Sequence, residues 1–357
     1  MEQSVQAQDC IKPAFVEVGF IRPVSCDRRE LSSVIKEELV DKLVEKIKKI
    51  FTDEELKLLI GYTKGTLPLR ATPFLIESAD DVDKLIFDFT CHNNLAKYLG
   101  DEKKRGGDKR KVGIIAKGCD ARAVVQLVVE GQIKRENVVI IGVPCGGVID
   151  PGKLRKKLTG REVVNFEVNG NKMTLFGNGF ELKLDRSELF SDSCLSCRYP
   201  NAAQYDYFIG EPAEPLGVRD EYASVDEFEQ KSPDERWAYF EKEYSKCVRC
   251  YACRNACPMC YCEECFVDCS TPQWIGKGND LSDTIIFHIV RVLHIAGRCV
   301  DCGACAAACP LNIDIRMLGK RVEKEVTRRF GFTAGLDFET QPAMAVFNEN
   351  DKEEFIM

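Results

Sequence analysis

The sequence predicts a mixed α/β (α+β) protein in which a sheet domain, with a parallel βαβ unit and hairpins, precedes a cysteine-rich C-terminal module. Three observations predict this. Two apolar strands, 112–116 and 138–143, flank a helical segment at 120–131. Three segments of alternating polarity follow, as in hairpins. Most of the 19 cysteines come after residue 190, at spacings that in a long chain indicate metal or redox chemistry.

The first 90 residues predict mostly helix. Apolar residues recur at helical spacing over 28–60, and Thr52 is a candidate cap for a second helix over 52–59, with Glu55 three residues on. A short apolar strand is expected at 73–76. Ser78 then begins a helix that runs to about Phe89.

The middle of the chain predicts the sheet. Strand, helix and strand over 112–143 form a parallel βαβ unit. Asn169-Gly170 and Gly177-Asn178-Gly179 separate three hairpin strands at 163–168, 172–176 and 180–184. A further strand is expected at 206–210, and the Pro- and Gly-rich segment 211–218 marks a boundary. Helices are expected over 225–246 and 281–297.

Charge and hydropathy exclude some classes of function. The net charge of -7 argues against a nucleic-acid partner. The basic block 103–111 is interpreted as a solvated loop, with a docking patch for an acidic partner or a phosphate as the alternative. No secretory signal opens the chain, and the apolar run 285–296 is too short and too polar for a membrane span. We therefore expect a cytoplasmic protein.

Two cysteine runs of the same spacing carry the strongest signal. Each has the pattern C-x2-C-x2-C-x3-C-P. In such a run three thiolates bind one cubane, and the fourth ligates the other cluster. We therefore expect two 4Fe-4S clusters in a dicluster ferredoxin-like module. One takes Cys247, Cys250, Cys253 and Cys309, and the other takes Cys299, Cys302, Cys305 and Cys257. The alternative is zinc, which prefers two separated cysteine pairs.

The insert between the runs holds four more cysteines: Cys260, Cys262, Cys265 and Cys269. They would bind a further cluster or a zinc ion, or would line the cluster pocket as small, half-buried residues. The spacing matches no cluster motif, so both interpretations stay open. His288 and His294 lie six residues apart and do not share a helix face cleanly, which favours packing over metal binding.

A second constellation lies in the first half. Cys119 follows the first strand of the βαβ unit and Cys145 follows the second. Parallel strands end at one edge of a sheet, where ligand sites form. Cys194 and Cys197, with a two-residue spacing, could supply two more ligands. Spacing alone leaves this cluster and four buried structural cysteines as equal interpretations.

From about Pro73 to Glu211 the sequence resembles the beta subunits of coenzyme F420-reducing hydrogenases and related formate dehydrogenases. The resemblance depends on the strand-Cys119 and strand-Cys145 pair, on the hairpins around 169–172, and on Cys194-Leu-Ser-Cys197 leading into 205–210. It implies that Cys119, Cys145, Cys194 and Cys197 bind a third 4Fe-4S cluster. In that family the cluster lies beside a flavin (FAD) that exchanges hydride with the deazaflavin. The segment 88–94 lacks the glycines that would seat the flavin here.

The resulting division of the chain has four parts. We expect an N-terminal helical region at 1–60, a hydrogenase/dehydrogenase beta-subunit-like domain at 61–215, the dicluster module at 216–330, and an acidic tail at 331–357 that is disordered or laid along a partner.

The leading functional hypothesis is an electron-transfer subunit of a larger redox complex, resembling a hydrogenase, formate dehydrogenase or heterodisulfide reductase. Its partners would be the other subunits of that complex. No acid–base pair or nucleophile stands out as catalytic. The alternatives are a flavin subunit that oxidises or reduces coenzyme F420 or a nicotinamide, and a zinc-organised interaction protein.

Overall fold

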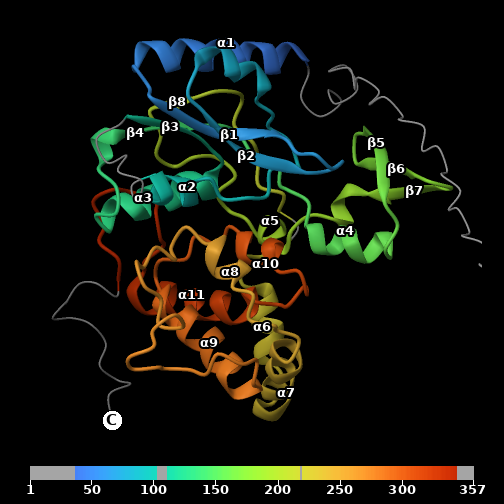
Figure 1. The fold of residues 1–357 in the computed structure, drawn as a ribbon, viewed down its shortest axis with the longest axis vertical. Helices are drawn as coiled ribbons and strands as arrows, with labels where there is room; N and C mark the ends of the chain where they lie inside the picture. Colours follow the sequence, from blue (N-terminus) through green and yellow to red (C-terminus); the bar gives the residue numbers. More distant parts are fainter. Residues whose placement is uncertain (1–36, 103–110, 218, 344–357) are drawn as a thin grey trace, which may run out of the picture.

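The computed structural model describes residues 37–102, 111–217 and 219–343. It confirms the mixed α/β class: a sheet domain lies above a helical, cysteine-rich part in Figure 1. The basic block at 103–110 and the first residues of the expected N-terminal helix, 28–36, fall outside the described residues, as does the end of the acidic tail.

A five-stranded sheet forms the centre of the first half. Its order is β2-β1-β3-β4-β8, with β2 antiparallel at one edge and the other four strands parallel. The central strands are buried along their whole length, as expected for a parallel sheet covered on both faces. The strands span β1 Leu58–Lys64, β2 Ala71–Ile76, β3 Val112–Ala116, β4 Val138–Gly142 and β8 Tyr207–Phe208.

The predicted βαβ unit is confirmed. The helix α3, Gly118–Val129, connects β3 to β4, which pair in parallel from Val112 beside Val138 to Ala116 beside Gly142. Its apolar side packs beneath the sheet with Val124 and Leu127 buried. This register brings the ends of β3 and β4 to one edge of the sheet.

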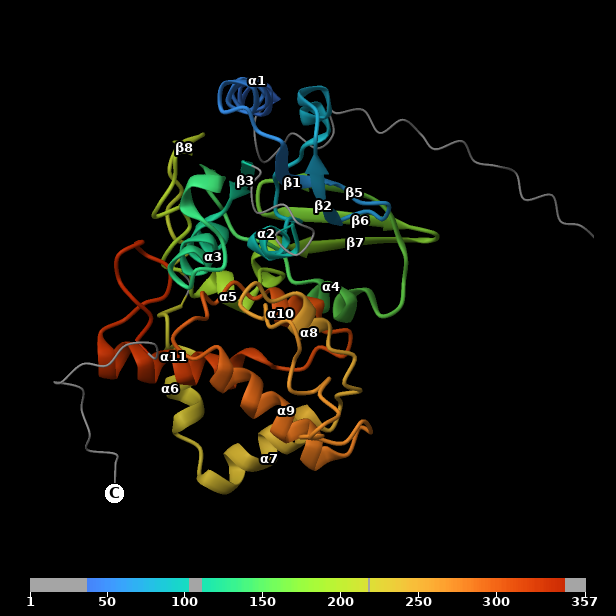
Figure 2. The same ribbon diagram turned by 60° about the vertical axis from the view of Figure 1, so that its left-hand side comes forward.

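Helices cover both faces of this sheet (Figures 1 and 2). On one face lie α1, Glu37–Asp53, and the 3-10 helix η2, Ala79–Lys84, which Ser78 caps through its side chain. On the other lie α3 and α2, Ala96–Glu102. A short 3-10 helix, η4 at Arg135–Asn137, precedes β4.

A separate three-stranded meander follows. Its strands are β5 Val163–Asn169, β6 Lys172–Gly177 and β7 Phe180–Asp185, which confirms the three predicted hairpin strands. The 3-10 helix η5, Arg186–Glu188, ends this unit. The helix α4, Pro151–Leu158, packs against the meander with Leu154 buried. Asp150 caps α4 by accepting bonds from two backbone amides, with proline at its first turn, a start signal that the sequence reasoning missed.

The cysteine-rich half consists of short helices and loops around two longer helices. One apolar core runs across both halves: Leu127 of α3 shares it with Val300, Val326 and Phe332. The helices are α5 Asp192–Leu195, α6 Ala223–Glu229, α7 Pro233–Tyr244, α8 Ala252–Asn255, α9 Leu281–His294, α10 Ala304–Ala308 and α11 Arg316–Phe330.

Several expected elements need correction. The prediction of a helix over 52–59 is wrong, because α1 ends at Asp53 and β1 begins at Leu58. The place of β1 between β2 and β3 buries its apolar residues more completely than a surface helix could. The helix expected from Ser78 to Phe89 ends at Lys84. The stretch 225–246 is two helices, because Ser232 and Pro233 cap and start a new one.

The described part of the tail, 331–343, packs against the rest of the protein. Phe332 and Ala334 are buried in the core that the two halves share. Arg122 of α3 donates a hydrogen bond to the carbonyl oxygen of Ala334 at 2.9 Å. This segment therefore packs on its own chain, contrary to the expectation of disorder or a partner.

Across the ranges given above, no helix combines the length and the apolar character that crossing a membrane requires.

Candidate cysteine centres

The four cysteines of the first half line one cavity. Cys119 begins α3 directly after β3, and Cys145 follows β4. Cys194 lies in α5, and Cys197 follows that helix. The structure therefore brings together residues from three separate segments, and the sheet edge predicted from the strand ends is where they meet.

Backbone contacts hold these segments in place. The amide of Val143 donates to the carbonyl oxygen of Ala116 at 3.0 Å, which extends the β3–β4 pairing toward the cavity. The amide of Cys145 donates to the carbonyl oxygen of Pro200 at 3.1 Å, and the amide of Val148 points at the Sγ atom of Cys194 at 3.4 Å. These hydrogen bonds therefore fix the backbone segments that carry the four thiols.

Gly118 lets two of these segments approach closely. A Cβ atom at this position would collide with the carbonyl oxygens of Tyr199 and Asn201. Only glycine permits that distance. The start of α3, which carries Cys119, is therefore pressed against the segment that follows Cys197.

A buried cation forms part of the cavity wall. Lys117 is 3% exposed and pairs with Asp120, which is fully buried, at 2.9 Å. The Lys117 amine also donates to the Tyr62 hydroxyl and, at 3.0 Å, to the carbonyl oxygen of Asn93. Burial alone would lower the pKa of Lys117, but Asp120 and Tyr62 hold it well above its ordinary value. Lys117 therefore stays charged beside the thiols.

Burial is the main cause of the raised pKa values of the thiols. It raises the pKa of Cys145 to about 12 and that of Cys119 well above the ordinary thiol value. The imidazole of His92 lines the same cavity, and burial lowers its pKa. Thiols in such surroundings give up their protons when a metal binds, so metal binding here would release protons.

The first cysteine run of the C-terminal half folds into a tight turn. Arg249 (φ 50°) and Tyr251 (φ 59°) adopt left-handed backbone conformations around Cys250. The amide of Arg249 points back at the Sγ atom of Cys247 at 3.3 Å. This turn and the start of α8 place three thiols on a single cavity, together with one thiol from the second run. The lining cysteines are Cys247, Cys250, Cys253 and Cys309.

The second run repeats this geometry. Asp301 (φ 51°) and Gly303 (φ 74°) occupy the positions that correspond to Arg249 and Tyr251, and the amide of Asp301 points at the Sγ atom of Cys299 at 3.4 Å. Here the fourth thiol comes from the first run. Burial, together with the nearby thiol of Cys257, raises the pKa of Cys302 to about 12.

Cys257 also raises the pKa values of the other two thiols of the second run. Burial comes first among the causes that raise the pKa values of Cys299 and Cys305, and Cys257 contributes to both. The structure thus places Cys309 of the second run in the cavity of the first run, and Cys257 of the first run lies close enough to the three other thiols of the second run to raise their pKa values.

The insert cysteines are placed differently. Cys260, Cys262 and Cys265 line a further cavity that also contains Arg254 and Arg298. Cys269 does not line it, and its Sγ atom lies 3.6 Å from the carbonyl oxygen of Cys265. Cys260 lies close enough to Cys257 for the two thiols to shift each other's pKa, which is lowered for Cys257 and raised for Cys260. The four insert cysteines are therefore not gathered around one centre.

No three His, Cys, Asp or Glu side chains in the described part of the chain are placed to bind one metal ion. A cubane sets a different requirement, since each of its four irons takes its own thiolate.

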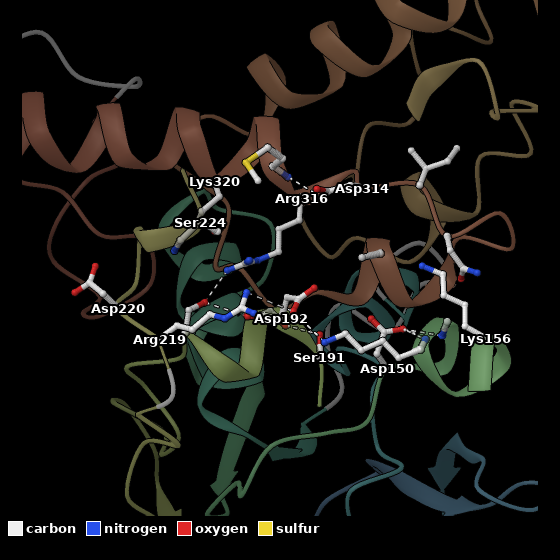
Figure 3. Close-up of a pocket in the computed structure, with 18 residues that line it drawn as sticks. Asp150, Lys156, Ser191, Asp192, Arg219, Asp220, Ser224, Asp314, Arg316 and Lys320 are labelled. Atoms are coloured by element: carbon white, nitrogen blue, oxygen red, sulfur yellow. Dashed lines mark hydrogen bonds and ion pairs between the residues drawn. The ribbon is translucent and has the colours of Figure 1, made fainter. Parts of the chain in front are cut away.

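The first-half cavity adjoins the second run directly. Cys302 and Asp301 line it together with the four cysteines of the first half. Next to it, a polar cleft of about 310 Å³ separates the two halves (Figure 3). In that view Arg316 and Lys320 of α11 lie on one side, and Ser191, Asp192 and Asp150 on the other.

Buried ion pairs join the walls of this cleft. Arg316 binds both carboxylate oxygens of Asp301 at 2.6 Å and donates to the Ser196 hydroxyl at 2.8 Å. Lys320, 3% exposed, also pairs with Asp301 at 3.1 Å. Asp301, in the middle of the second cysteine run, is therefore fixed between α11 and the segment that carries Cys194 and Cys197.

A second ion pair between the two halves lies at the C-terminal end of α3. Arg298 donates to both carboxylate oxygens of Glu130, each at 2.7 Å, and the Tyr261 hydroxyl bonds the same carboxylate. Burial would raise the pKa of Glu130, but the bonds from Arg298 and Tyr261 lower it overall. Glu130 therefore ties the insert and the end of α9 to the sheet domain.

Sequence reasoning missed the charged residues that support the thiols: Lys117, Asp120, Arg291, Asp301, Arg316 and Lys320. Lys117 and Asp120 had a local signal, since they flank Gly118-Cys119 directly after a strand. Asp301 lies inside the second run. For Arg291 and Arg316, isolated arginines in helices, the sequence gives no signal of this kind.

The chain is similar to known proteins over a region that includes the first-half cysteines. Residues 109–260 match the family model for the C terminus of the beta subunit of coenzyme F420 hydrogenase/dehydrogenase. The chain is 26% identical over 304 residues to the F420-dependent formate dehydrogenase subunit beta of Methanocaldococcus jannaschii, covering 70% of this chain and 78% of that protein. It is 25% identical over 351 residues to the F420-dependent formate dehydrogenase 1 subunit beta of Methanococcus maripaludis, covering 80% and 88%.

A solved structure is also similar: a chain of the F420-reducing [NiFe] hydrogenase complex from Methanosarcina barkeri. The TM-score is 0.34 at 15% sequence identity, and the match covers 48% of this chain and 64% of that chain.

Proposed function

We propose that this chain belongs to the coenzyme F420 hydrogenase/dehydrogenase beta subunit family, whose model matches its residues 109–260, and that it is an iron–sulfur electron-transfer subunit of a multi-subunit redox complex. It would hold three 4Fe-4S clusters, one in the first half and two in the ferredoxin-like module. When bound, such clusters carry one electron at a time.

The placement of the cysteines carries this proposal: four line the first-half cavity, four line the cavity of the first run, and Cys257 raises the pKa values of Cys299, Cys302 and Cys305. Cys302 of the second run lines the cavity of the first-half group. Cys305 of the same run lies close enough to Cys253 of the first run to affect its pKa, which burial raises to about 12. The second-run group therefore lies between the other two, which is the arrangement that a linear electron relay requires.

The donor set fits cubane clusters. All twelve positions are thiols, which are the ligands that iron–sulfur clusters take. At each group a backbone amide points at a cysteine sulfur, and such bonds raise the reduction potential of a cluster. The donors are the amides of Val148, Arg249, Asp301 and Ile313, at 3.3–3.5 Å from the sulfurs of Cys194, Cys247, Cys299 and Cys309.

The chain's own residues also keep water away from the three groups. Cys253, Cys257 and Cys309 are buried, and Cys250 is the exposed member of its group. The first-run group, at the end of the proposed relay, is therefore the one that approaches the surface. We infer that electrons enter or leave the chain there.

The partners follow from the relatives. Both relatives named above are beta subunits of F420-dependent formate dehydrogenases. We propose that this chain also works inside a complex, of the hydrogenase, formate dehydrogenase or heterodisulfide reductase kind, in the cytoplasm. We expect the isolated chain to be a poor oxidoreductase, because no acid–base pair or nucleophile in the sequence stands out as catalytic.

Iron analysis and low-temperature paramagnetic resonance on the anaerobically purified full-length chain test the proposal. Three cubanes would give about twelve irons per chain. A value near eight would remove the first-half cluster, and one near sixteen would add a cluster at Cys260, Cys262, Cys265 and Cys269. A colourless protein without iron would refute the proposal and favour a zinc-organised interaction protein.

A second candidate function is a flavin subunit that exchanges hydride with coenzyme F420 or a nicotinamide. The names of the two relatives favour it, since both are called F420-dependent. His92 lines both the first-half cysteine cavity and a neighbouring cavity with Arg70 and Arg155, where an FAD would lie next to the cluster. A flavin absorbance spectrum in the purified subunit, and its bleaching by reduced F420, would separate the two functions.

A further inference from the structure

Arg291 of α9 is a buried cation at the junction of the two ferredoxin-type groups. Its side chain is 4% exposed. One guanidinium nitrogen donates to the carbonyl oxygen of Cys253 at 3.2 Å, and the guanidinium lies close enough to the thiol of Cys305 to oppose the rise in the pKa of Cys305 that burial causes. Cys253 belongs to one proposed cluster and Cys305 to the other, so a single side chain lies near both.

Within residues 37–102, 111–217 and 219–343, Arg291 makes no ion pair with a carboxylate, and its Nε atom has no hydrogen-bond partner. Burial would lower the pKa of Arg291, but the thiols of Cys305, Cys257, Cys253 and Cys260 hold it well above its ordinary value. An unpaired buried charge is costly, so such groups are normally paired.

Two other buried cations have carboxylate partners. Lys117 pairs with Asp120, and Lys320, together with the half-buried Arg316, pairs with Asp301. In contrast, the neighbours of Arg291 are proposed cluster ligands. A cubane with four thiolates is an anion, and an anion on each side would supply the missing counter-charge.

We propose that Arg291 is the shared counter-ion of both ferredoxin-type clusters and raises the reduction potential of both. The inference depends on the cluster assignment proposed above. Reduction adds one negative charge to a cluster, and a fixed cation nearby stabilises the reduced form. The effect is large in a buried site because the local dielectric is low. Since Arg291 lies between the groups, it would keep the two potentials close together and would favour transfer in both directions.

Replacement of Arg291 in the full-length chain tests this role. In Arg291→Gln the iron content should stay near the wild-type value, while both ferredoxin-type potentials fall, measured by redox titration with paramagnetic resonance. We expect at least a tenfold shift in each reduction equilibrium, which is about 59 mV for one electron. Arg291→Lys, which keeps the charge, should shift them less. Arg254→Gln is the matched control, because Arg254 already has a carboxylate partner in Asp268 at 2.7 Å.

Unchanged potentials in Arg291→Gln with its iron retained would overturn the inference. If Arg291→Gln loses its iron, a second pair of variants decides. His294 lines the same cavity as Arg291 and is exposed, so His294→Glu would partly neutralise Arg291 without removing it. Leu293→Glu adds the same charge at a position that is 59% exposed. The inference requires a clearly larger fall in potential for His294→Glu than for Leu293→Glu, and equal effects would refute it.

The two levels of the proposal fail in different ways. If the wild-type chain shows no cubane signals, the proposed function is wrong. If those signals are present and the reduction potentials do not change when the charge at position 291 is removed, only the proposed role of Arg291 is wrong.

Discussion

The backbone of Gly303 lies directly against the side chain of Ser193. A Cβ atom at position 303 would collide with the Ser193 hydroxyl, and Gly303 also has a positive φ of 74°. Gly303 follows Cys302, and Ser193 precedes Cys194. This contact therefore brings the second cysteine run next to the first-half group, and it joins two groups of the proposed relay.

Gly303→Ala should weaken that link. The added methyl group must push the second run away from Ser193, and alanine is strained at this φ. We expect a loss of about 1–3 kcal/mol in the free energy of unfolding. We also expect slower electron exchange between the first-half cluster and the module. Chemical denaturation and freeze-quench paramagnetic resonance measure the two effects.

Gly319→Ala is the control for that prediction. Gly319 lies inside α11, and a Cβ atom added there would meet only open space. Alanine at this position should therefore stabilise the protein by up to about 1 kcal/mol. Equal stability and equal exchange rates in the two variants would contradict the role of the Gly303–Ser193 contact.

Changing Cys194 and Cys197 together to serine should remove one cluster. We expect a loss of about four irons per chain with the ferredoxin-type signals intact. Cys269→Ser, a change at a cysteine outside all three groups, should leave the iron content at the wild-type value. An unchanged iron content in the double variant would disprove the first-half assignment and leave four buried thiols with packing roles.

Removal of the clusters should destabilise the C-terminal half. Its core places the thiols of Cys253 and Cys309 among large side chains such as Tyr244 and Phe287. A cluster bound there would join segments that are otherwise short helices and loops, so cluster binding would be part of the folding energy. Cys305→Ser, or treatment of the wild-type chain with an iron chelator, should abolish the cooperative thermal transition of this half in calorimetry. A cooperative transition that persists in the iron-free chain would show that the half folds without its clusters.

Lys117→Met should destabilise the protein strongly. It leaves the fully buried carboxylate of Asp120 without its partner, and breaking a buried pair costs about 3–5 kcal/mol. Lys157→Met breaks an exposed pair with Glu188, whose side chains are 45% and 50% exposed, and should cost at most about 1 kcal/mol. Urea denaturation compares the two. Similar losses for both variants would mean that Asp120 becomes neutral or finds another partner.

Local patterns allowed several elements to be predicted. The strands 112–116 and 138–143 and the three hairpin strands were identifiable because continuous or alternating apolar residues and Asn-Gly turns are local signals. The spacing within each cysteine run predicted which thiols belong together, since a thiolate can reach a cluster only from a few backbone positions. The structure places Cys247, Cys250, Cys253 and Cys309 along one cavity, and it places the four first-half cysteines, which the family resemblance implied as a set, along another.

Other elements depended on contacts between distant residues. The helix expected over 52–59 gave way to β1 because pairing with β2 and β3 outweighs the local helical preference. The helix α11 and the packing of the described tail were missed for the same reason, since their apolar contacts lie on α3 and its neighbours.

By itself, the sequence determined the class of the protein and the βαβ unit and predicted the two sets of cysteines in the C-terminal runs, because each rests on local spacing. The first-half set was predicted from the ends of neighbouring strands together with the family resemblance. Only the tertiary structure decided the order of the three groups and the place of Arg291 between two of them. Those features arise where Gly303 meets Ser193, where Arg298 meets Glu130, and where α9 reaches both cysteine runs. Contacts between such distant segments are set by the packing of the whole core, which no local pattern encodes.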